Sequence, residues 1–321
     1  MFFKNSIQSP PYFVKVDIDN FFHYSVLSDL KLWSMTQVIN KNFINKIWLF
    51  LLLFSVNSLI NLSYANERIV VAGDALTEIV FDLGAGEDIV GVDGSSRYPK
   101  QVTQLPQIGN VKLLNIEAVL SLTPSLVISF DDAEIANVLK KISQAKVEVL
   151  TLKRVPITVE LLYENINKIA VKLDRAKEGQ KLIKRIQNDL SLIQNRTATR
   201  RQKTKVLCLM NMEGNIFIAG KNTAIDALIT IAGGENLATH NSVRTYTSEL
   251  LIAMNPEVII LTNHSIEELG GFDKINTIPG ITETDAYKNH GIVIIDDSYL
   301  FAIGPRVVEV VFELFNGFYP E

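Results

Sequence analysis

Residues 67–99 read ERIVVAGDALTEIVFDLGAGEDIVGVDGSSRYP, with two apolar runs on either side of a helical pattern. Two short apolar runs, Arg68–Ala72 and Ile89–Val92, are typical of buried strands. Between them apolar residues recur at helical spacing, and Gly84 can end that helix. A strand, a helix and a second strand in this order predict a parallel sheet covered by helices.

The same alternation continues along the chain in two blocks. Residues 67–155 are predicted to form an N-terminal α/β lobe and residues 204–319 a C-terminal one. The fold class is therefore α/β, with two Rossmann-like lobes. Because ligands favour clefts between domains, we expect the ligand to bind between the lobes.

Residues 156–198 connect the lobes and keep helical spacing of apolar residues throughout. Gly179 is the one glycine of this segment, and a glycine costs only about 1 kcal/mol in a helix. We therefore expect one long helix between the lobes. The alternative is two shorter helices broken near Gly179.

The N-terminal region has the features of an export signal. In residues 35–65, basic Lys41 and Lys46 precede an apolar run, and Ser63-Tyr64-Ala65 is a small-x-small cleavage site. We expect cleavage after Ala65 and a soluble periplasmic protein. The alternative is an uncleaved membrane anchor, but the apolar run is shorter than the roughly 20 residues that cross a membrane. Residues 1–34 form a leader of doubtful status.

Composition excludes several functions. The formal net charge is −4, without the basic footprint of a nucleic-acid-binding protein. Cys208 is the only cysteine, which rules out an intramolecular disulfide and a cysteine metal site. No Gly-x-Ser-x-Gly, no Gly-x-Gly-x-x-Gly after a strand and no His-Glu-x-x-His occurs, so we expect no enzyme.

The loop Gly94–Lys100 follows the second predicted strand and holds Tyr98. Pro99 keeps Tyr98 extended, and a phenolate oxygen can bind ferric iron, including haem iron. Tyr98 is therefore a candidate iron ligand. The alternative is a loop aromatic that packs on a neighbour.

Each lobe repeats one short motif, a glutamate that opens an apolar helix, then proline and a strand. The two glutamates are Glu117 and Glu249. They are candidates for a paired function, although a carboxylate at a helix N-terminus also stabilises the helix dipole.

Three histidines follow Ala65, and a divalent-metal carrier would need more ligands than His240, His264 and His290 supply. His264 follows an apolar strand and could approach a bound ligand; the alternative is a solvated loop histidine. Asp131-Asp132 is expected to belong to a helix start rather than a catalytic pair.

A set of short segments resembles the periplasmic binding proteins whose lobes are joined by a single helix (class III), which serve ABC importers of haem, siderophores and cobalamin. Among them the haem-binding proteins are most similar. The segments are Arg68–Val70, Thr77–Ile79, Leu83–Gly86, Ser95–Pro99, Leu105–Gly109, Leu114–Glu117, Ala232–Asn236, Leu269–Gly271, Ile278–Ile281 and Gly304–Arg306.

This resemblance implies a site. Tyr98 corresponds to the axial ligand of haem iron, and Glu117 and Glu249 to the glutamates that dock on the two permease subunits. Arg244 is the nearest match to a second-lobe cation that approaches the ligand, although Ser242–Thr245 replaces the family's usual Gly-Tyr-Lys-Pro-like run. The candidate ligand-binding residues are Tyr98, Arg97, Arg244 and Arg306.

The implied function is capture of haem in the periplasm and delivery to an ABC permease dimer with its ATPase. An outer-membrane haem receptor is a further expected partner, and we expect a monomer that closes only slightly on its ligand. The alternative is a ferric-siderophore or cobalamin carrier of the same importer family.

Overall fold

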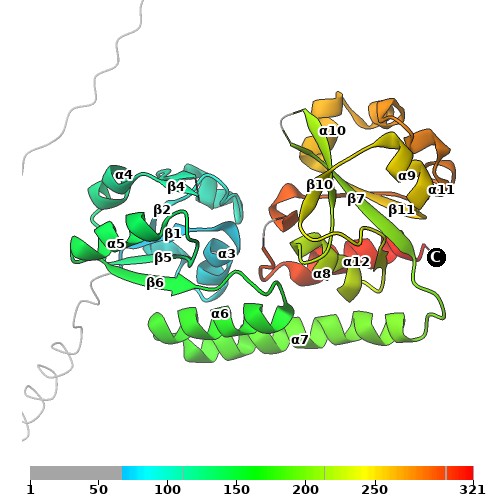
Figure 1. Cartoon of the computed structure of the whole chain (residues 1–321). Coiled ribbons are helices and arrows are strands. Elements are labelled where there is room, and N and C mark those ends of the chain that lie inside the picture. Colours follow the sequence, from blue (N-terminus) through cyan, green and yellow to red (C-terminus); the bar gives the residue numbers. More distant parts are fainter. Residues whose placement is uncertain (1–66, 111, 213, 301, 321) are drawn as a thin grey trace, which may run out of the picture. The chain divides into compact units, whose positions relative to one another are not determined.

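The computed structural model describes residues 67–110, 112–212, 214–300 and 302–320. The predicted leader 1–34 and signal peptide 35–65 lie outside these residues. The described chain belongs to one compact unit and carries two α/β lobes (Figure 1). The predicted fold class is therefore confirmed.

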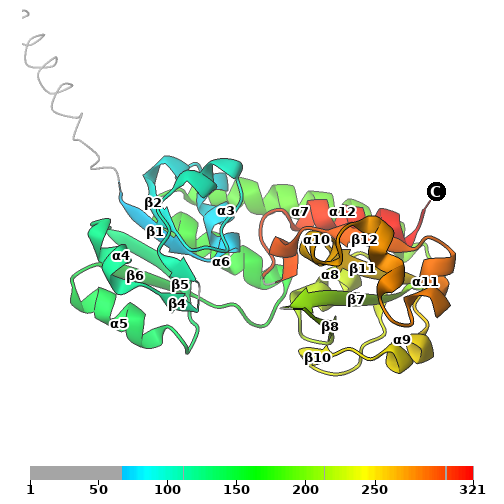
Figure 2. The same ribbon diagram turned by 90° about the horizontal axis from the view of Figure 1, so that it is seen from above.

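The N-terminal lobe is built on four parallel strands in the order β2-β1-β5-β6. Alternate residues of β1 face opposite sides, so Ile69 and Val71 enter a core with α3 and α6, whereas Val70 and Ala72 face α4 and α5. Figure 2 shows the sheet between these helices. The elements are β1 (Ile69–Ala72), α3 (Asp74–Asp82), β2 (Ile89–Val92), α4 (Ile116–Ser121), β5 (Leu126–Phe130), α5 (Ala136–Gln144), β6 (Glu148–Leu152) and α6 (Val159–Lys172).

The C-terminal lobe holds a mixed six-stranded sheet in the order β10-β8-β7-β11-β12, with β9 also paired to β7. One face packs on α8 and α12, the other on α9, α10 and α11. The elements are β7 (Lys205–Met212), β8 (Asn215–Ala219), α8 (Ala224–Ile231), β9 (Glu235–Asn236), β10 (Val243–Thr245), α9 (Ser248–Met254), β11 (Val258–Thr262), α10 (Asn263–Leu269), α11 (Asp285–Lys288), β12 (Ile292–Ile295) and α12 (Val307–Phe318).

Short elements complete the two lobes. The ribbon of β3 (Gly109–Asn110) and β4 (Leu113–Leu114) is antiparallel. The connections between longer elements include the 3-10 turns η1 (Gly86–Asp88), η2 (Lys100–Gln104), η3 (Phe272–Thr277), η4 (Ile281–Glu283) and η5 (Asp297–Leu300). Cys208 is buried in the sheet, as its apolar surroundings predict.

The prediction of one helix over 156–198 is wrong. The chain forms α6 and then α7 (Ala176–Ala198), separated by a turn in which Asp174 has a φ of 54°. Gly179 does not break a helix either; it lies inside α7, where an added Cβ would sit 2.6 Å from Ala170 Cβ. Gly179 therefore permits the close packing of α7 on α6, which the figures show side by side.

Helix α7 runs from the N-terminal lobe to the C-terminal lobe. Its Arg185 Nη2 lies 2.8 Å from Oδ2 of Asp82 in the N-terminal lobe, and further along α7 packs on α12 of the C-terminal lobe. Its buried residues, Leu182, Ile186, Leu190 and Ile193, lie on one face at helical spacing. The prediction of lobes joined by a long helix is thus confirmed for α7. None of the described helices combines the length and the apolar character that crossing a membrane requires.

Candidate functional site

The Tyr98 loop is anchored by a buried carboxylate. Asp93 follows β2 and is fully buried; its Oδ1 accepts hydrogen bonds from Gly73 N and Ser96 Oγ, both at 2.8 Å. Its Oδ2 accepts from the backbone N–H and the hydroxyl of Ser95. A carboxylate that accepts four hydrogen bonds fixes the path of this loop.

A second contact ties the loop to α3. Thr77 Oγ1 lies 2.9 Å from Ser96 Oγ, and Thr77 also donates to Gly73 O. Ser96 is thus held by both Asp93 and Thr77, two residues before Tyr98. The loop that carries Tyr98 is therefore hydrogen-bonded to α3 of the N-terminal lobe.

Tyr98 lies beneath an arginine of the other lobe. The guanidinium carbon of Arg306 is 4.1 Å from the Tyr98 ring centroid, the geometry of a cation–π contact. The Tyr98 residue is 46% exposed, and among the described residues its phenol oxygen makes no hydrogen bond. The ring is held while the oxygen is free to take a ligand.

Arg306 is held by residues of both lobes. Its Nε and Nη2 donate to Glu78 Oε1 of α3 at 2.9 and 2.6 Å. Within its own lobe, Nη2 donates to Ser298 Oγ at 2.9 Å and Nη1 to the hydroxyl of Tyr299 at 3.2 Å. The same guanidinium lies 4.9 Å from the Tyr299 ring centroid.

Burial shifts the ionisation of this cluster. Burial raises the pKa of Glu78, and the hydrogen bonds and charge of Arg306 oppose that rise. Burial disfavours the charge of Arg306, but Glu78 outweighs it and raises the pKa of Arg306. Burial also raises the pKa of the Tyr299 phenol far above its usual range. Tyr299 is therefore a neutral hydrogen-bond partner.

Asp74, one turn before Glu78 on α3, is a further buried acid. Burial raises the pKa of Asp74 to about 7, with smaller increases from Glu78 and Asp93 and decreases from its hydrogen bond to Ala75 N and from Arg154. The face of α3 near the site therefore holds two carboxyl groups out of water.

Arg97 precedes Tyr98 and is exposed. It lies close enough to Asp296 of the C-terminal lobe to act on it. Burial raises the pKa of Asp296, but hydrogen bonds from Ser298 and the charges of Arg306 and Arg97 outweigh it, with a net lowering. Arg97, Tyr98 and Arg306 therefore lie in one region, at the ends of β2 and β12.

Arg244 is not part of this region. It lies on β10, paired in register with Ile218 of β8, and is exposed. Its guanidinium forms no hydrogen bond or ion pair with Tyr98 or with any other side chain in the described parts of the chain. Its predicted action on Tyr98 stays a prediction.

Glu117 and Glu249 are exposed, one in each lobe, in the first turns of α4 and α9. Asn115 caps α4 and Thr247 caps α9, each accepting from a backbone N–H. Hydrogen bonds from the backbone and from Ser248 and Thr247 lower the pKa of Glu249. Both carboxylates are presented to solvent, as a docking role requires.

The remaining polar candidates have partners. The His264 ring lies 3.2 Å from Oε1 of Glu268, one helical turn along α10. Asp132 pairs with Arg154 at 2.6 Å and does not cap α5 with its side chain. Among the described residues, no group of three or more histidine, cysteine or acidic residues is arranged to hold a metal ion.

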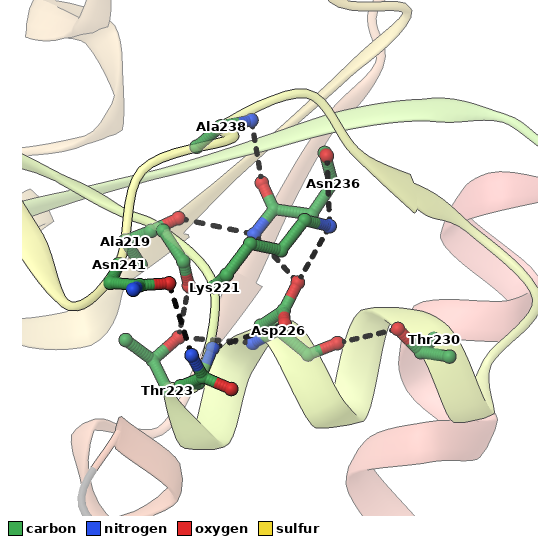
Figure 3. Close-up of polar contacts among 10 residues, drawn as sticks. Ala219, Lys221, Thr223, Asp226, Thr230, Asn236, Ala238 and Asn241 are labelled. Carbon is green, nitrogen blue, oxygen red and sulfur yellow. Dashed lines mark hydrogen bonds and ion pairs between the residues drawn. The ribbon is translucent and has the colours of Figure 1, made fainter.

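A large cavity lies away from Tyr98. It has a volume of about 860 Å³ between the start of α6, α7 and α8, and neither Tyr98 nor Arg306 lines it. At its edge Asp226 accepts from Lys221 Nζ and Asn236 Nδ2, both at 3.1 Å (Figure 3). Lys221 also donates to Asn236 O at 3.3 Å. These charges are satisfied within the protein, so this network stabilises the lobe.

Residues 69–299 match the periplasmic binding protein family. The chain belongs to this family. It is a periplasmic substrate-binding protein of an ABC importer, a class of solute-binding protein that works with a permease and an ATPase.

Two solved structures are similar over most of this periplasmic binding protein. The periplasmic heme-binding protein RhuT from Roseiflexus sp. RS-1 is 32% identical, with a TM-score of 0.74 over 79% of this chain and 98% of that one. The heme-binding protein HutB of Vibrio cholerae is 30% identical, with a TM-score of 0.72 over 79% and 100%.

A curated relative has another ligand in its name. The vitamin B12-binding protein of Vibrio parahaemolyticus is 25% identical over 85% of this chain and 97% of its own length. The comparisons therefore agree on the family and differ on the ligand.

Sequence reasoning missed Asp93, Glu78, Ser298 and Tyr299. Thr77–Ile79 and Gly304–Arg306 were both in the segments that resemble the family, but their 228-residue separation hid the ion pair. Asp93 carried a signal, since an aspartate followed by Gly-Ser-Ser commonly organises a turn.

Proposed function

We propose that this protein captures haem in the periplasm and delivers it to the permease of an ABC importer. Tyr98 would supply the axial oxygen to ferric haem iron. The observation that carries the proposal is the free phenol oxygen of Tyr98, on a loop fixed by buried Asp93, with its ring held by Arg306. A preorganised ligand loses little freedom on binding, which favours affinity.

Three arginines complete the proposed ligand-binding set. Arg97 is exposed beside Tyr98 and can reach a carboxylate at the edge of the ligand. Arg306 lies over the Tyr98 ring. Arg244 would need the ligand itself, or a movement of β10, to act with them. Haem carries two propionates, which the exposed Arg97 and Arg244 would bind, whereas the guanidinium of Arg306 already donates to Glu78, Ser298 and Tyr299.

Delivery would use Glu117 and Glu249. Both are exposed at helix starts, one in each lobe, so each can meet one subunit of a permease dimer. Such charged contacts orient docking more than they add affinity. We further propose cleavage after Ala65, export to the periplasm and an outer-membrane haem receptor upstream.

Cobalamin is the second candidate, because curated relatives of similar coverage are named vitamin B12-binding proteins. A cobalamin carrier, like a siderophore carrier, receives a metal whose coordination sites are filled by its own chelate. It would have no need of the Tyr98 oxygen. The solved haem-binding neighbours and the free Tyr98 oxygen favour haem over cobalamin.

Direct titration separates the two ligands. Purified residues 66–321 are titrated with haemin and with cyanocobalamin, followed by absorbance and by calorimetry. We expect saturable haemin binding with a tyrosinate-to-iron charge-transfer band and no saturable cobalamin binding. Saturation by cyanocobalamin alone would replace haem by cobalamin in this proposal.

A further inference from the structure

An ion pair between Glu78 and Arg306 connects the two lobes next to Tyr98. Glu78 belongs to α3 of the N-terminal lobe, and Arg306 immediately precedes α12 of the C-terminal lobe (Figure 1). Two guanidinium nitrogens donate to the same carboxylate oxygen, at 2.9 and 2.6 Å. The Glu78 and Arg306 side chains are only 7% and 13% exposed, respectively.

The C-terminal lobe holds Arg306 in the orientation that this contact needs. Ser298 and Tyr299, which belong to η5, accept two of its N–H groups. Because both ends of the guanidinium are committed, it cannot rotate away from Glu78 without loss of hydrogen bonds. The lobes are thus joined through a preorganised donor rather than a flexible surface chain.

Gly304 makes room for the carboxylate. A Cβ on this residue would lie 2.9 Å from Glu78 Oε2 and 3.4 Å from Ala75. The backbone of the C-terminal lobe therefore approaches α3 as closely as a glycine permits. The Glu78–Arg306 ion pair therefore belongs to a closely packed interface between the lobes and differs from an exposed pair of surface charges.

The same guanidinium contacts the Tyr98 ring. Its carbon lies 4.1 Å from the ring centroid, so one cation contacts both a carboxylate and a phenol ring of the N-terminal lobe. Loss of Glu78 would leave Arg306 buried without its anion, a costly state that favours withdrawal of the side chain. Withdrawal would remove the support of the Tyr98 ring.

We propose that Glu78 and Arg306 form a clasp that fixes the two lobes relative to each other in the ligand-free protein and holds the Tyr98 side chain in its binding position. Glu78 is a positioning residue that acts through Arg306. The part that concerns Tyr98 rests on the proposed haem function, whereas the part that concerns the lobes does not.

The lobe part is tested without ligand. Spin labels are placed on exposed sites of each lobe, Lys140→Cys on α5 and Lys274→Cys on η3, and the distance between them is measured by electron–electron double resonance. We expect one narrow distance distribution that broadens in Glu78→Gln and in the milder Arg306→Lys. Circular dichroism confirms that each variant is folded.

Asp82→Asn is the matched control. Asp82 lies on the same helix, one turn after Glu78, and also pairs with an arginine, Arg185, but that pair is far more exposed. Its distance distribution should equal that of the parent protein. An unchanged narrow distribution in both Glu78→Gln and Arg306→Lys would overturn the clasp.

The Tyr98 part is tested by haemin titration of Glu78→Gln. We expect about tenfold weaker binding and a diminished charge-transfer band, because the ring loses its support. Unchanged affinity and spectrum, with the parent protein binding haemin, would overturn the positioning role. If the parent protein binds only cobalamin, the haem function fails and the distance measurement still decides the clasp.

Discussion

The guanidinium of Arg306 lies 4.1 Å from the ring centroid of Tyr98, and the two residues belong to different lobes. The Arg306 cation of the C-terminal lobe thus covers one face of the Tyr98 ring. The phenol oxygen of Tyr98 makes no hydrogen bond among the described residues. This contact fixes the ring and leaves the oxygen available to a ligand.

The two exposed glutamates should matter for transport and not for ligand binding. Glu117→Ala/Glu249→Ala should bind haemin as the parent does but fail to stimulate the ATPase of the transporter in liposomes, because the permease loses both charged contacts. Glu134→Ala/Glu267→Ala, which removes one exposed glutamate from each lobe, is the control. Full stimulation by Glu117→Ala/Glu249→Ala would refute the docking role.

Arg244 should act on the phenolate if it approaches the bound ligand. Arg244→Ala should bind haemin several-fold more weakly, with binding moved to higher pH, because a nearby cation favours phenolate over phenol. The measurement is haemin affinity between pH 6 and pH 9. A pH profile identical to that of the parent would show that Arg244, exposed on β10, has no part in the site.

Gly179 should be required for the packing of α7 on α6. In Gly179→Leu the added side chain must displace Ala170, whose Cβ lies 2.6 Å from the position of the first added carbon. We expect a loss of about 1–3 kcal/mol of unfolding free energy. Urea denaturation measures it, with Lys181→Ala on the exposed side of α7 as control. Stability equal to the parent would contradict the close contact.

Asp74 should make stability depend on pH. Burial raises its pKa to about 7, so the folded state binds a proton more tightly than the unfolded one. The stabilisation is fully present below pH 3.8 and is lost as pH rises towards 7, by up to about 4 kcal/mol. Asp74→Asn should flatten this dependence in urea denaturation at pH 5, 6, 7 and 8. An unaltered slope would show that Asp74 is ionised in the folded protein.

The sheets could be predicted because their strands are continuous apolar runs, as in β5 and β11, and both faces of each are buried. The turn between α6 and α7 could not. It contains neither glycine nor proline, and Asp174 adopts a positive φ that only the packing of the two helices makes favourable.

The candidate site was only half visible in the sequence. Tyr98 follows a strand and precedes a proline, which are local features. Glu78 lies within the apolar pattern of α3, Arg306 lies just before that of α12, and only the fold brings them together across 228 residues. Long-range pairing of this kind leaves no local pattern in a single sequence.

Tyr98→Phe isolates the contribution of the phenol oxygen, because it removes that one atom and keeps the ring beneath Arg306. Haemin is titrated into the parent, into Tyr98→Phe and into the control Tyr163→Phe, and the absorbance spectra are compared. We predict that Tyr98→Phe alone loses the tyrosinate-to-iron band and most of its haemin affinity. A Tyr98→Phe spectrum and affinity equal to those of the parent would contradict Tyr98 as the iron ligand.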